Sequence, residues 1–263
     1  MKNLRKLLCD FTGLMRLCGV AVGCKWLLMA IIKAKEILQR GDLQPADQKM
    51  GLGPFKIRFK RGGPCFWIMG QGAVSGIREM YVRDCYLRGG KLTIEDGDTV
   101  LDLGANMGNF TNLALAHGPN VRVIAVEPNS ELNAVFMQSV SLNEGFQDRV
   151  TLIRAFVGGM TEKQREMMQY ASSRDALRID TKELVAMAKS ASINFLKCDI
   201  EGAEFELFNK QNILLERTLK IAMEIHSFAG DVRSMLGLLQ RSGFTITSTC
   251  WDKNGSCTVL AKR

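Results

Sequence analysis

The stretch Val100–Phe110 (VLDLGANMGNF) decides the fold, because it passes from an apolar strand through a glycine loop into a helix. Gly104 and Gly108 let the backbone turn sharply and approach a ligand closely before the helix begins. The pattern D-x-G-x-x-x-G differs from the dinucleotide fingerprint G-x-G-x-x-G and lacks the Lys-Ser/Thr pair of a P-loop. The stretch therefore predicts a strand–loop–helix unit that binds a ligand without needing to hold a pyrophosphate.

A second block, Val126–Asn129 (VEPN), follows about twenty residues later, where the next predicted strand ends. An acidic side chain at this place suits two hydrogen bonds to the diol of a ribose. A glycine loop and a ribose acid without phosphate-binding features fit S-adenosylmethionine better than NAD. Each signal alone could be an ordinary turn or a surface acid, but their order and spacing together favour a cofactor site.

Apolar strands alternate with helical segments from Thr99 onward. The expected strands are 99–103, 121–126, 149–156, 192–199, 219–225, 244–250 and 256–261. The expected helices are 108–117, 130–144, 181–190, 203–216 and 230–241. This alternation predicts an α/β fold with a Rossmann-like, doubly wound sheet of about seven strands, the last of which runs antiparallel.

The region before Thr99 divides into two further parts. Residues 54–98 contain an alternating run, 55–59, and a second short run, 65–69, which together predict a small β-hairpin, and then a helical segment at 73–87. Turn-forming residues between Gly41 and Gly53 separate this region from an N-terminal helical arm. We therefore divide the chain into an arm with its linker (1–53), the hairpin and helix (54–98) and the main domain (99–263).

The arm carries most of the net charge of +8. Residues 1–40 hold eight bases against Asp10 and Glu36, and subtracting these from the totals of 35 bases and 27 acids leaves 27 bases and 25 acids elsewhere. A nearly neutral body argues against a nucleic-acid substrate. Apolar residues of the arm recur at helical spacing with bases between them, which is typical of a peripheral membrane helix. The same pattern also fits a helix that packs on the domain or mediates dimerisation.

The cysteines and the N-terminus bear on the compartment. Eight cysteines form no C-x-x-C pair, and two histidines are too few for an ordinary structural zinc site. Scattered cysteines of this kind suit a reducing compartment. The arm has no secretory signal, and its uncharged runs, 17–24 and 26–32, are too short to span a bilayer. We expect a cytoplasmic protein, with peripheral contact to the inner face of a membrane as one use of the arm.

Phe195–Phe205 (FLKCDIEGAEF) places three carboxylates directly after an apolar run. Asp199 ends the fourth predicted strand, beside the point where the strand order reverses and where ligands bind in open α/β sheets. One carboxylate could act as a general base, or the group could only orient a cofactor and its loop. Glu201 and Glu204 also precede a helix whose N-terminus favours negative charge, and we expect this role above all for Glu204.

His226 ends the fifth predicted strand and should lie at the same sheet edge as Asp199. An imidazole there can serve as a base near neutral pH, although a lone histidine is often structural. Asp199 with Glu224 or His226 could instead hold a divalent metal that polarises a hydroxyl group. The residue types support neither use over the other, so the metal question stays open.

The blocks at 100–108, 126–129 and 197–204 resemble the three signature blocks of the FkbM family, which are class I S-adenosylmethionine-dependent methyltransferases. The resemblance extends over about residues 75–262 and leaves the arm outside. It implies S-adenosylmethionine as cofactor and an O-methyltransferase acting on a small molecule or a glycan, since family members often methylate sugars or polyketide-type natural products. The alternatives are methylation of nitrogen or of an RNA 2′-hydroxyl, and a silent cofactor-binding module at a membrane surface.

The resemblance also implies the residues of the site. The cofactor candidates are Glu79, Asp102, Gly104, Ala105, Asn106, Gly108, Phe110, Glu127, Pro128, Asn129, Asn143, Ala155 and Asp199. Among them Glu127 would hold the ribose, Asn143 would support the adenine end, and Ala155 would place backbone groups beside the adenine. The glycine loop would line the methionine side, and the match of Glu79 is looser. The catalytic candidates are Asp199, Glu201 and His226.

Overall fold

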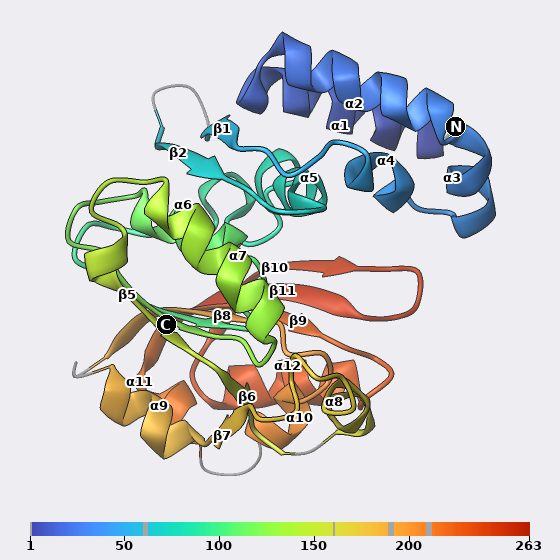
Figure 1. Cartoon of the computed structure of the whole chain (residues 1–263). Coiled ribbons are helices and arrows are strands. Elements are labelled where there is room, and N and C mark those ends of the chain that lie inside the picture. The colour runs from blue at the N-terminus through green and yellow to red at the C-terminus, as the bar shows by residue number, and fades with distance from the viewer. Residues whose placement is uncertain (1, 60–62, 160, 189–191, 209–211) are drawn as a thin grey trace.

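The computed structural model describes residues 2–59, 63–159, 161–188, 192–208 and 212–263 (Figure 1). Among them, a main sheet of seven strands has the order β10-β11-β9-β8-β3-β4-β5. In chain order its strands are β3 (Thr99–Leu103), β4 (Arg122–Val126), β5 (Val150–Ile153), β8 (Ile193–Cys198), β9 (Thr218–Ile225), β10 (Thr245–Trp251) and β11 (Cys257–Lys262). Neighbours from β9 to β5 are parallel, whereas β11 runs antiparallel to β9 and β10. The predicted doubly wound sheet with an antiparallel last strand is confirmed.

Helices cover both faces of this sheet (Figure 1). The main-domain helices are α6 (Asn109–Leu115), α7 (Ser130–Ser141), α9 (Thr181–Met187), α10 (Glu204–Leu207), α11 (Ile213–Arg217) and α12 (Val232–Arg241). Successive strand residues point to opposite faces of a sheet. Val100 therefore packs in the core shared with α6 and α7, while Leu101 packs in the core on the side of α10, α11 and α12.

The single strand predicted at 149–156 is wrong, because the chain leaves the main sheet at Arg154. This side chain donates to the backbone carbonyls of Pro128 and Ser172, at 3.4 and 3.1 Å. The following strand, β6 (Ala155–Val157), pairs instead with β7 (Leu177–Ile179), and α8 (Glu162–Met167) lies between them. A short 3-10 helix, η3 (Gln147–Arg149), precedes β5.

Two predicted helices also end differently. The helix expected at 203–216 is two helices, α10 and α11, because the Asn212 side chain accepts from the backbone N–H groups of Leu214 and Leu215 and so starts a new one. The segment expected as one helix at 73–87 is α5 (Ala73–Gly76) and the π-helix η1 (Ile77–Val82). Residues 189–190 of the helix expected at 181–190 and residues 209–211 of the helix expected at 203–216 lie outside the described residues.

The N-terminal region forms a helical cap. Its helices are α1 (Lys2–Cys18), α2 (Val20–Ile32), α3 (Ala34–Arg40) and α4 (Gln44–Gln48). The predicted hairpin consists of β1 (Phe55–Arg58) and β2 (Cys65–Ile68), and a 3-10 helix, η2 (Arg88–Gly90), precedes the main domain. Leu14 and Trp26 of the cap share one hydrophobic core with Phe55, Ile77 and Val100. This core therefore runs through all three parts of the predicted division. The division itself stays a prediction.

Buried ion pairs fix the cap to the rest of the chain. The Arg78 guanidinium contacts Asp10 at 2.7 Å and Asp47 at 2.5 Å, and Arg83 contacts Asp10 at 2.6 Å. The indole N–H of Trp26 also donates to Asp47, at 2.7 Å. The inner side of the arm therefore packs on the chain that follows it. In the part of the chain that the structure describes, no helix is both long enough and apolar enough to cross a membrane.

Candidate active site

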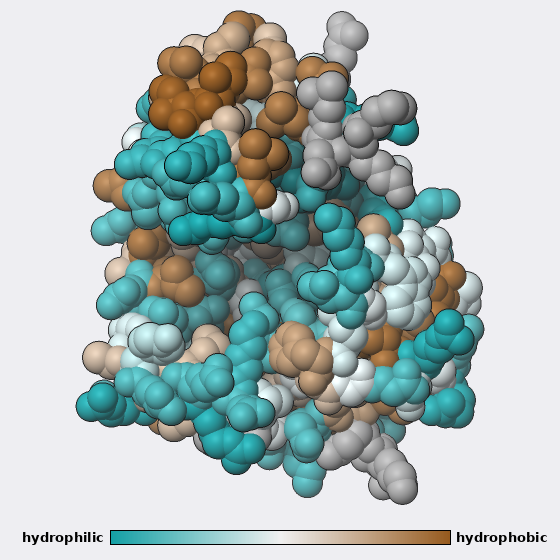
Figure 2. Space-filling model, turned by 90° about the vertical axis from the view of Figure 1, so that its right-hand side faces the viewer, coloured by the Kyte–Doolittle hydropathy of each residue, from teal (hydrophilic) through white to brown (hydrophobic). Residues whose placement is uncertain are grey.

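A cavity of about 630 Å³ opens at the carboxyl ends of β3, β4, β8 and β9, where the strand order reverses between β3 and β8. Figure 2 shows the surface hollowed below the N-terminal helices. The volume lies in the range of small-molecule sites, about 300–1,000 Å³. The predicted site residues that line it are Glu79, Ala105, Gly104, Asn106, Glu127, Pro128, Ala155, Asp199, Glu201 and His226. They come from elements far apart in the sequence, and the fold brings them together.

Five predicted cofactor residues do not line this cavity: Asp102, Gly108, Phe110, Asn129 and Asn143. Gly108 has φ of +79°, and a Cβ added there would lie 2.6 Å from the Phe136 ring, so glycine lets α6 and α7 approach. Phe110 is buried in the core. The Asn129 side chain accepts from two backbone N–H groups at the start of α7 and caps that helix.

The other two hold neighbouring elements in place. The Asn143 side chain accepts from the backbone N–H of Trp67 at 2.7 Å and donates to its carbonyl at 2.9 Å, which ties β2 to the main domain. Asp102 is buried, accepts from the Thr111 hydroxyl at 2.7 Å and lies 3.3 Å from the Lys197 ammonium. Any contribution of these residues to a cofactor would act through the elements that they position.

The glycine loop lies directly against the end of β8. Gly104 has φ of +75°, and a Cβ added there would lie 1.8 Å from the backbone oxygen of Asp199, so no side chain fits. Lys197 donates to the Gly104 carbonyl at 2.7 Å from beneath the loop. Burial lowers the pKa of Lys197, but the charges of Asp102 and Asp199 more than offset this and raise it. The loop is thus fixed by a buried cation that sequence reasoning missed, although a lysine within an apolar strand was a visible signal.

Glu127 lies at the end of β4 and is buried. Its two carboxylate oxygens accept from the backbone N–H groups of Asn106 and Asn129, each at 3.0 Å. Burial raises the pKa of this carboxyl group. A carboxylate has about four lone-pair sites, so the two backbone donors leave acceptor capacity on a side chain that lines the cavity.

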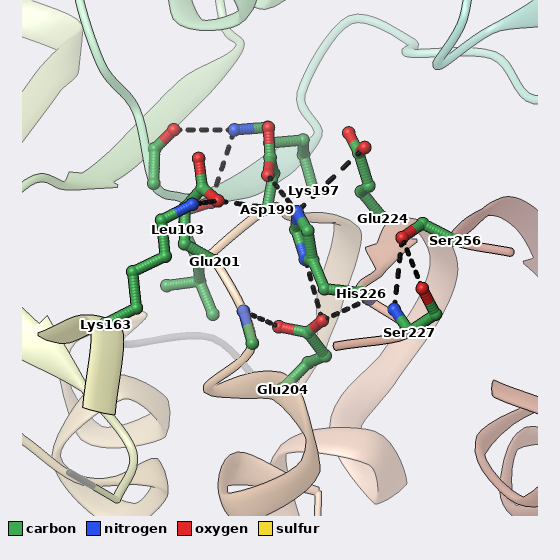
Figure 3. Close-up of polar contacts among 12 residues, drawn as sticks. Leu103, Lys163, Lys197, Asp199, Glu201, Glu204, Glu224, His226, Ser227 and Ser256 are labelled. Atoms are coloured by element: carbon green, nitrogen blue, oxygen red, sulfur yellow. Dashed lines mark hydrogen bonds and ion pairs between the residues drawn. The ribbon is translucent and has the colours of Figure 1, made fainter. Parts of the chain in front are cut away.

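His226 follows β9 and is held by Glu204 (Figure 3). One Glu204 oxygen lies 2.8 Å from His226 Nδ1 and accepts from the His226 backbone N–H at 2.7 Å, while the other accepts from Gly202 at 2.9 Å. Glu204 begins α10 as expected but is fully buried. The interpretation of Glu204 as a helix-start charge is therefore incomplete, because its carboxylate orients the histidine. Spacing within the sequence does not reveal this contact, which joins two different elements.

The other ring nitrogen of His226 faces three carboxylates (Figure 3). The distances from Nε2 are 3.7 Å to Glu201, 3.8 Å to Asp199 and 4.0 Å to Glu224. The Asp199 side chain also accepts from the Tyr86 hydroxyl at 3.1 Å. Glu201, which has φ of +56°, is half-exposed and forms an ion pair with Lys163. We name His226 with Glu204, Asp199, Glu201 and Glu224 the histidine–carboxylate cluster.

The charges of this cluster shift two of its pKa values. Burial, with the charge of Asp199, raises the pKa of Glu224 to about 7. Burial lowers the pKa of His226, but the hydrogen bond to Glu204 and the surrounding carboxylates more than offset this and raise it to about 9. The imidazole therefore holds a proton tightly and lies among four carboxylates, of which Glu201 is also paired with Lys163. The cluster keeps an excess of negative charge beside the cavity.

Three of these side chains could also bind a metal ion. Asp199, Glu224 and His226 each offer one ligand atom, and these atoms lie within 4.8 Å of one another. Carboxylate and imidazole donors suit several divalent cations. A metal would compete with the His226 proton, because imidazole coordinates only in its neutral form. The same atoms can therefore serve as a proton acceptor or as a metal site, but not as both at once.

Known methyltransferases are similar to this chain. The family model described as "Methyltransferase FkbM domain" matches residues 102–246. The 31-O-demethyl-FK506 methyltransferase FkbM of Streptomyces tacrolimicus is 27% identical over 212 residues, which cover 65% of this chain and 81% of that protein. A methyltransferase FkbM structure from Methylobacillus flagellatus gives a TM-score of 0.49 at 15% identity, covering 72% of this chain and 54% of that one. A precorrin-6y C5,15-methyltransferase from Geobacter metallireducens gives 0.45 at 15% identity, covering 69% and 88%.

Proposed function

This chain belongs to the FkbM methyltransferase family, and from that premise we propose that it methylates a hydroxyl group of a small molecule or glycan, with S-adenosylmethionine as donor. The match to the family model confirms the family and the enzyme class that the three sequence blocks predicted. The choice of a hydroxyl acceptor is supported by the relative from Streptomyces tacrolimicus, whose name describes a 31-O-demethyl substrate. The nearly neutral body of the chain favours such an acceptor over RNA.

The residues at the carboxyl ends of β3 and β4 fit the proposed cofactor. The buried carboxylate of Glu127 retains acceptor capacity toward the cavity and would hold the ribose hydroxyls. The backbone between Gly104 and Asn106 would lie against the methionine part, with Lys197 fixing the loop from below. When bound, S-adenosylmethionine supplies a methyl group activated by its positive sulfonium.

The observation that carries the proposal is the position of His226 at the same cavity, with its ring held by Glu204. When Nδ1–H donates to Glu204, the neutral ring presents Nε2 as a proton acceptor. An acceptor hydroxyl could pass its proton to Nε2, and the surrounding carboxylates would stabilise the imidazolium that results. Positioned bases of this kind contribute about 10²–10⁴-fold to a rate.

Asp199 would connect the cofactor loop with this base. Its backbone oxygen lies against Gly104, while its side chain faces His226 Nε2 and is held by Tyr86. This placement suits an electrostatic and positioning role for Asp199. Glu201, which is half-exposed, paired with Lys163 and part of the cavity lining, would contact the acceptor.

A metal-assisted mechanism is the second candidate, favoured by the three ligand atoms of Asp199, Glu224 and His226. A divalent cation there would lower the pKa of a bound hydroxyl and replace the base. Methyl transfer is to be measured before and after chelation and after adding back Mg²⁺ or Mn²⁺. Unchanged turnover after chelation would leave His226 as the base, and loss that the metal reverses would assign the cluster to metal binding.

The cofactor is tested by thermal unfolding of the full chain with S-adenosylmethionine and with its demethylated product, against ATP and NAD as controls. A ligand at 100 times its Kd stabilises a protein by about 2.7 kcal/mol. We expect this stabilisation for the first two ligands and its loss in Glu127→Ala. The absence of any stabilisation by either would overturn the proposed function at its first step.

The acceptor is tested by mass spectrometry of glycans, metabolites and RNA nucleosides from cells with and without the gene. We expect a hydroxylated small molecule or glycan that differs by one methyl group. The purified chain should then methylate the demethyl form with labelled S-adenosylmethionine. A methylated nitrogen or an RNA 2′-O-methyl group as the only difference would replace the proposed acceptor.

A further inference from the structure

The outer side of α2 and α3 is apolar and open to solvent. The side chains more than half exposed there are Val20, Leu28, Ile31, Ile32 and Leu38. Figure 2 shows apolar side chains gathered over the N-terminal helices, at the top of the molecule. We name these five residues the apolar patch.

An ordinary surface helix carries polar side chains outward and apolar ones inward. The inward side of α2 follows this rule, since Gly23, Trp26 and Ala30 are buried against the rest of the cap. The outward side breaks it, because Leu28 and Ile31 face solvent with few polar neighbours on the same helix. A contiguous apolar surface of this kind indicates an interaction site.

Exposed bases lie on the same two helices as the apolar patch, with Lys25 on α2 and Lys35 and Arg40 on α3. The bases of residues 5–50 are Arg5, Lys6, Arg16, Lys25, Lys33, Lys35, Arg40 and Lys49. Of the four acids in this range, Asp10 and Asp47 are buried in ion pairs with Arg78. Only Glu36 and Asp42 oppose the eight bases at the surface. The cap therefore carries an excess of positive charge, and part of that charge lies on the two helices of the apolar patch.

We propose that the outer surface of α2 and α3 docks on an anionic lipid bilayer. Apolar side chains would enter the interface between headgroups and acyl chains, and the bases would contact lipid phosphates. A second copy of the chain fits less well, because pairing two caps through the patch would bring two positive surfaces together. Docking would also hold the cavity close to the membrane, since α4 follows α3 directly and supplies Gln44 and Gln48 to the cavity wall.

The test is flotation of the full chain with vesicles of phosphatidylcholine alone, or of phosphatidylcholine mixed equally with phosphatidylserine. We expect the chain to float with the mixed vesicles and to stay at the bottom with phosphatidylcholine. Leu28→Ser with Ile31→Ser should lower the partition coefficient at least about tenfold. Lys35→Gln with Arg40→Gln should lower it about fivefold for each base.

The matched control is Leu177→Ser with Met187→Ser, two exposed apolar residues of β7 and α9 on the opposite side of the main sheet. This variant should float like the unchanged chain. Stabilisation by S-adenosylmethionine, measured on every variant, shows that each one is folded and keeps the binding result separate from the proposed reaction.

Three outcomes would overturn the proposal. In the first, the unchanged chain floats with neither kind of vesicle. In the second, the patch variant floats as well as the control. In the third, the unchanged chain sediments as a dimer that Leu28→Ser with Ile31→Ser dissociates, and vesicles do not compete with that dimer. This last result would assign the apolar patch to self-association.

Discussion

Among the described residues, two clusters of charged side chains differ in their balance of cations and anions. Where the cap meets η1, Arg78 and Arg83 face Asp10 and Asp47, so cations and anions are equal in number. In the histidine–carboxylate cluster, one imidazole and the Lys163 ammonium face four carboxylates. Burying a charge is costly unless it is paired, and the first cluster meets that condition fully.

The difference separates a structural task from a functional one. The balanced cluster joins α1 and α4 to η1, and each of its charges is neutralised within the protein. The unbalanced cluster leaves negative charge directed at a cavity, which is where perturbed pKa values mark functional sites. We therefore expect changes in the first cluster to affect stability and changes in the second to affect chemistry.

The largest effect is expected on the methyl-transfer activity of the His226→Gln variant. Removing the base should lower kcat/KM about 10²–10⁴-fold, measured as methyl transfer from labelled S-adenosylmethionine to the acceptor identified by mass spectrometry. Thermal stabilisation by the cofactor should be retained, because the Glu127 end of the cavity is untouched. His117→Gln is the control, since it removes the other histidine of the chain outside the cavity. Full activity of His226→Gln would exclude the proposed base.

The second-largest effect is expected on the stability of the Arg78→Met variant. The substitution leaves Asp10 and Asp47 buried without their shared cation, and breaking a buried pair in this way costs about 3–5 kcal/mol. We expect that loss in the free energy of unfolding, measured by urea denaturation. Arg83→Met should cost clearly less, because Arg83 is partly exposed and Asp10 keeps Arg78. No loss in Arg78→Met would show that the cap does not depend on the balanced cluster.

Much of the fold could be predicted from the sequence because it depends on local periodicity. The apolar runs around Val100 and the glycines after it define the first strand and loop, and the alternation that follows determines the doubly wound sheet. The errors arise where one side chain changes the path of the backbone. Arg154 ends β5 by bonding to distant carbonyls, and Asn212 begins α11 by capping it. Neither event leaves a periodic signal.

The candidate site was predictable in part, for a related reason. Gly104, Glu127 and Asp199 each follow a strand, and parallel strands bring their carboxyl ends to one edge of the sheet. The roles of Glu204 and Lys197 were missed because they come from contacts between different elements. Glu204 contacts His226, which follows β9, and Lys197 contacts the loop after β3. Spacing along the chain shows which residues follow a strand but not which of them meet across the sheet.

A smaller effect is expected in Glu204→Gln, which removes the charge that orients His226. The partners of metal-bound histidines set the scale, because their loss lowers activity about 10–100-fold. The pKa of His226 should fall as well, because Glu204 is among the groups that raise it. Nuclear magnetic resonance of the imidazole measures this shift directly, and the chain has only two histidines. A loss of stability with no change in that pKa would make Glu204 a structural residue only.

The smallest effect is expected from a change in pH, because the rate should change by at most about tenfold per pH unit. The folded state raises the pKa of His226 from 6.5 to about 9, so the protonated ring contributes stability below pH 6.5 that is lost as the pH rises toward 9. Because the proposed base acts in its neutral form, kcat/KM should rise over the same interval and level off near pH 9. Glu224→Gln removes a charge that raises this pKa, so the rate should level off at a lower pH. A rise that ends near pH 7 and persists in His226→Gln would instead assign the proton transfer to Glu224, whose pKa is about 7.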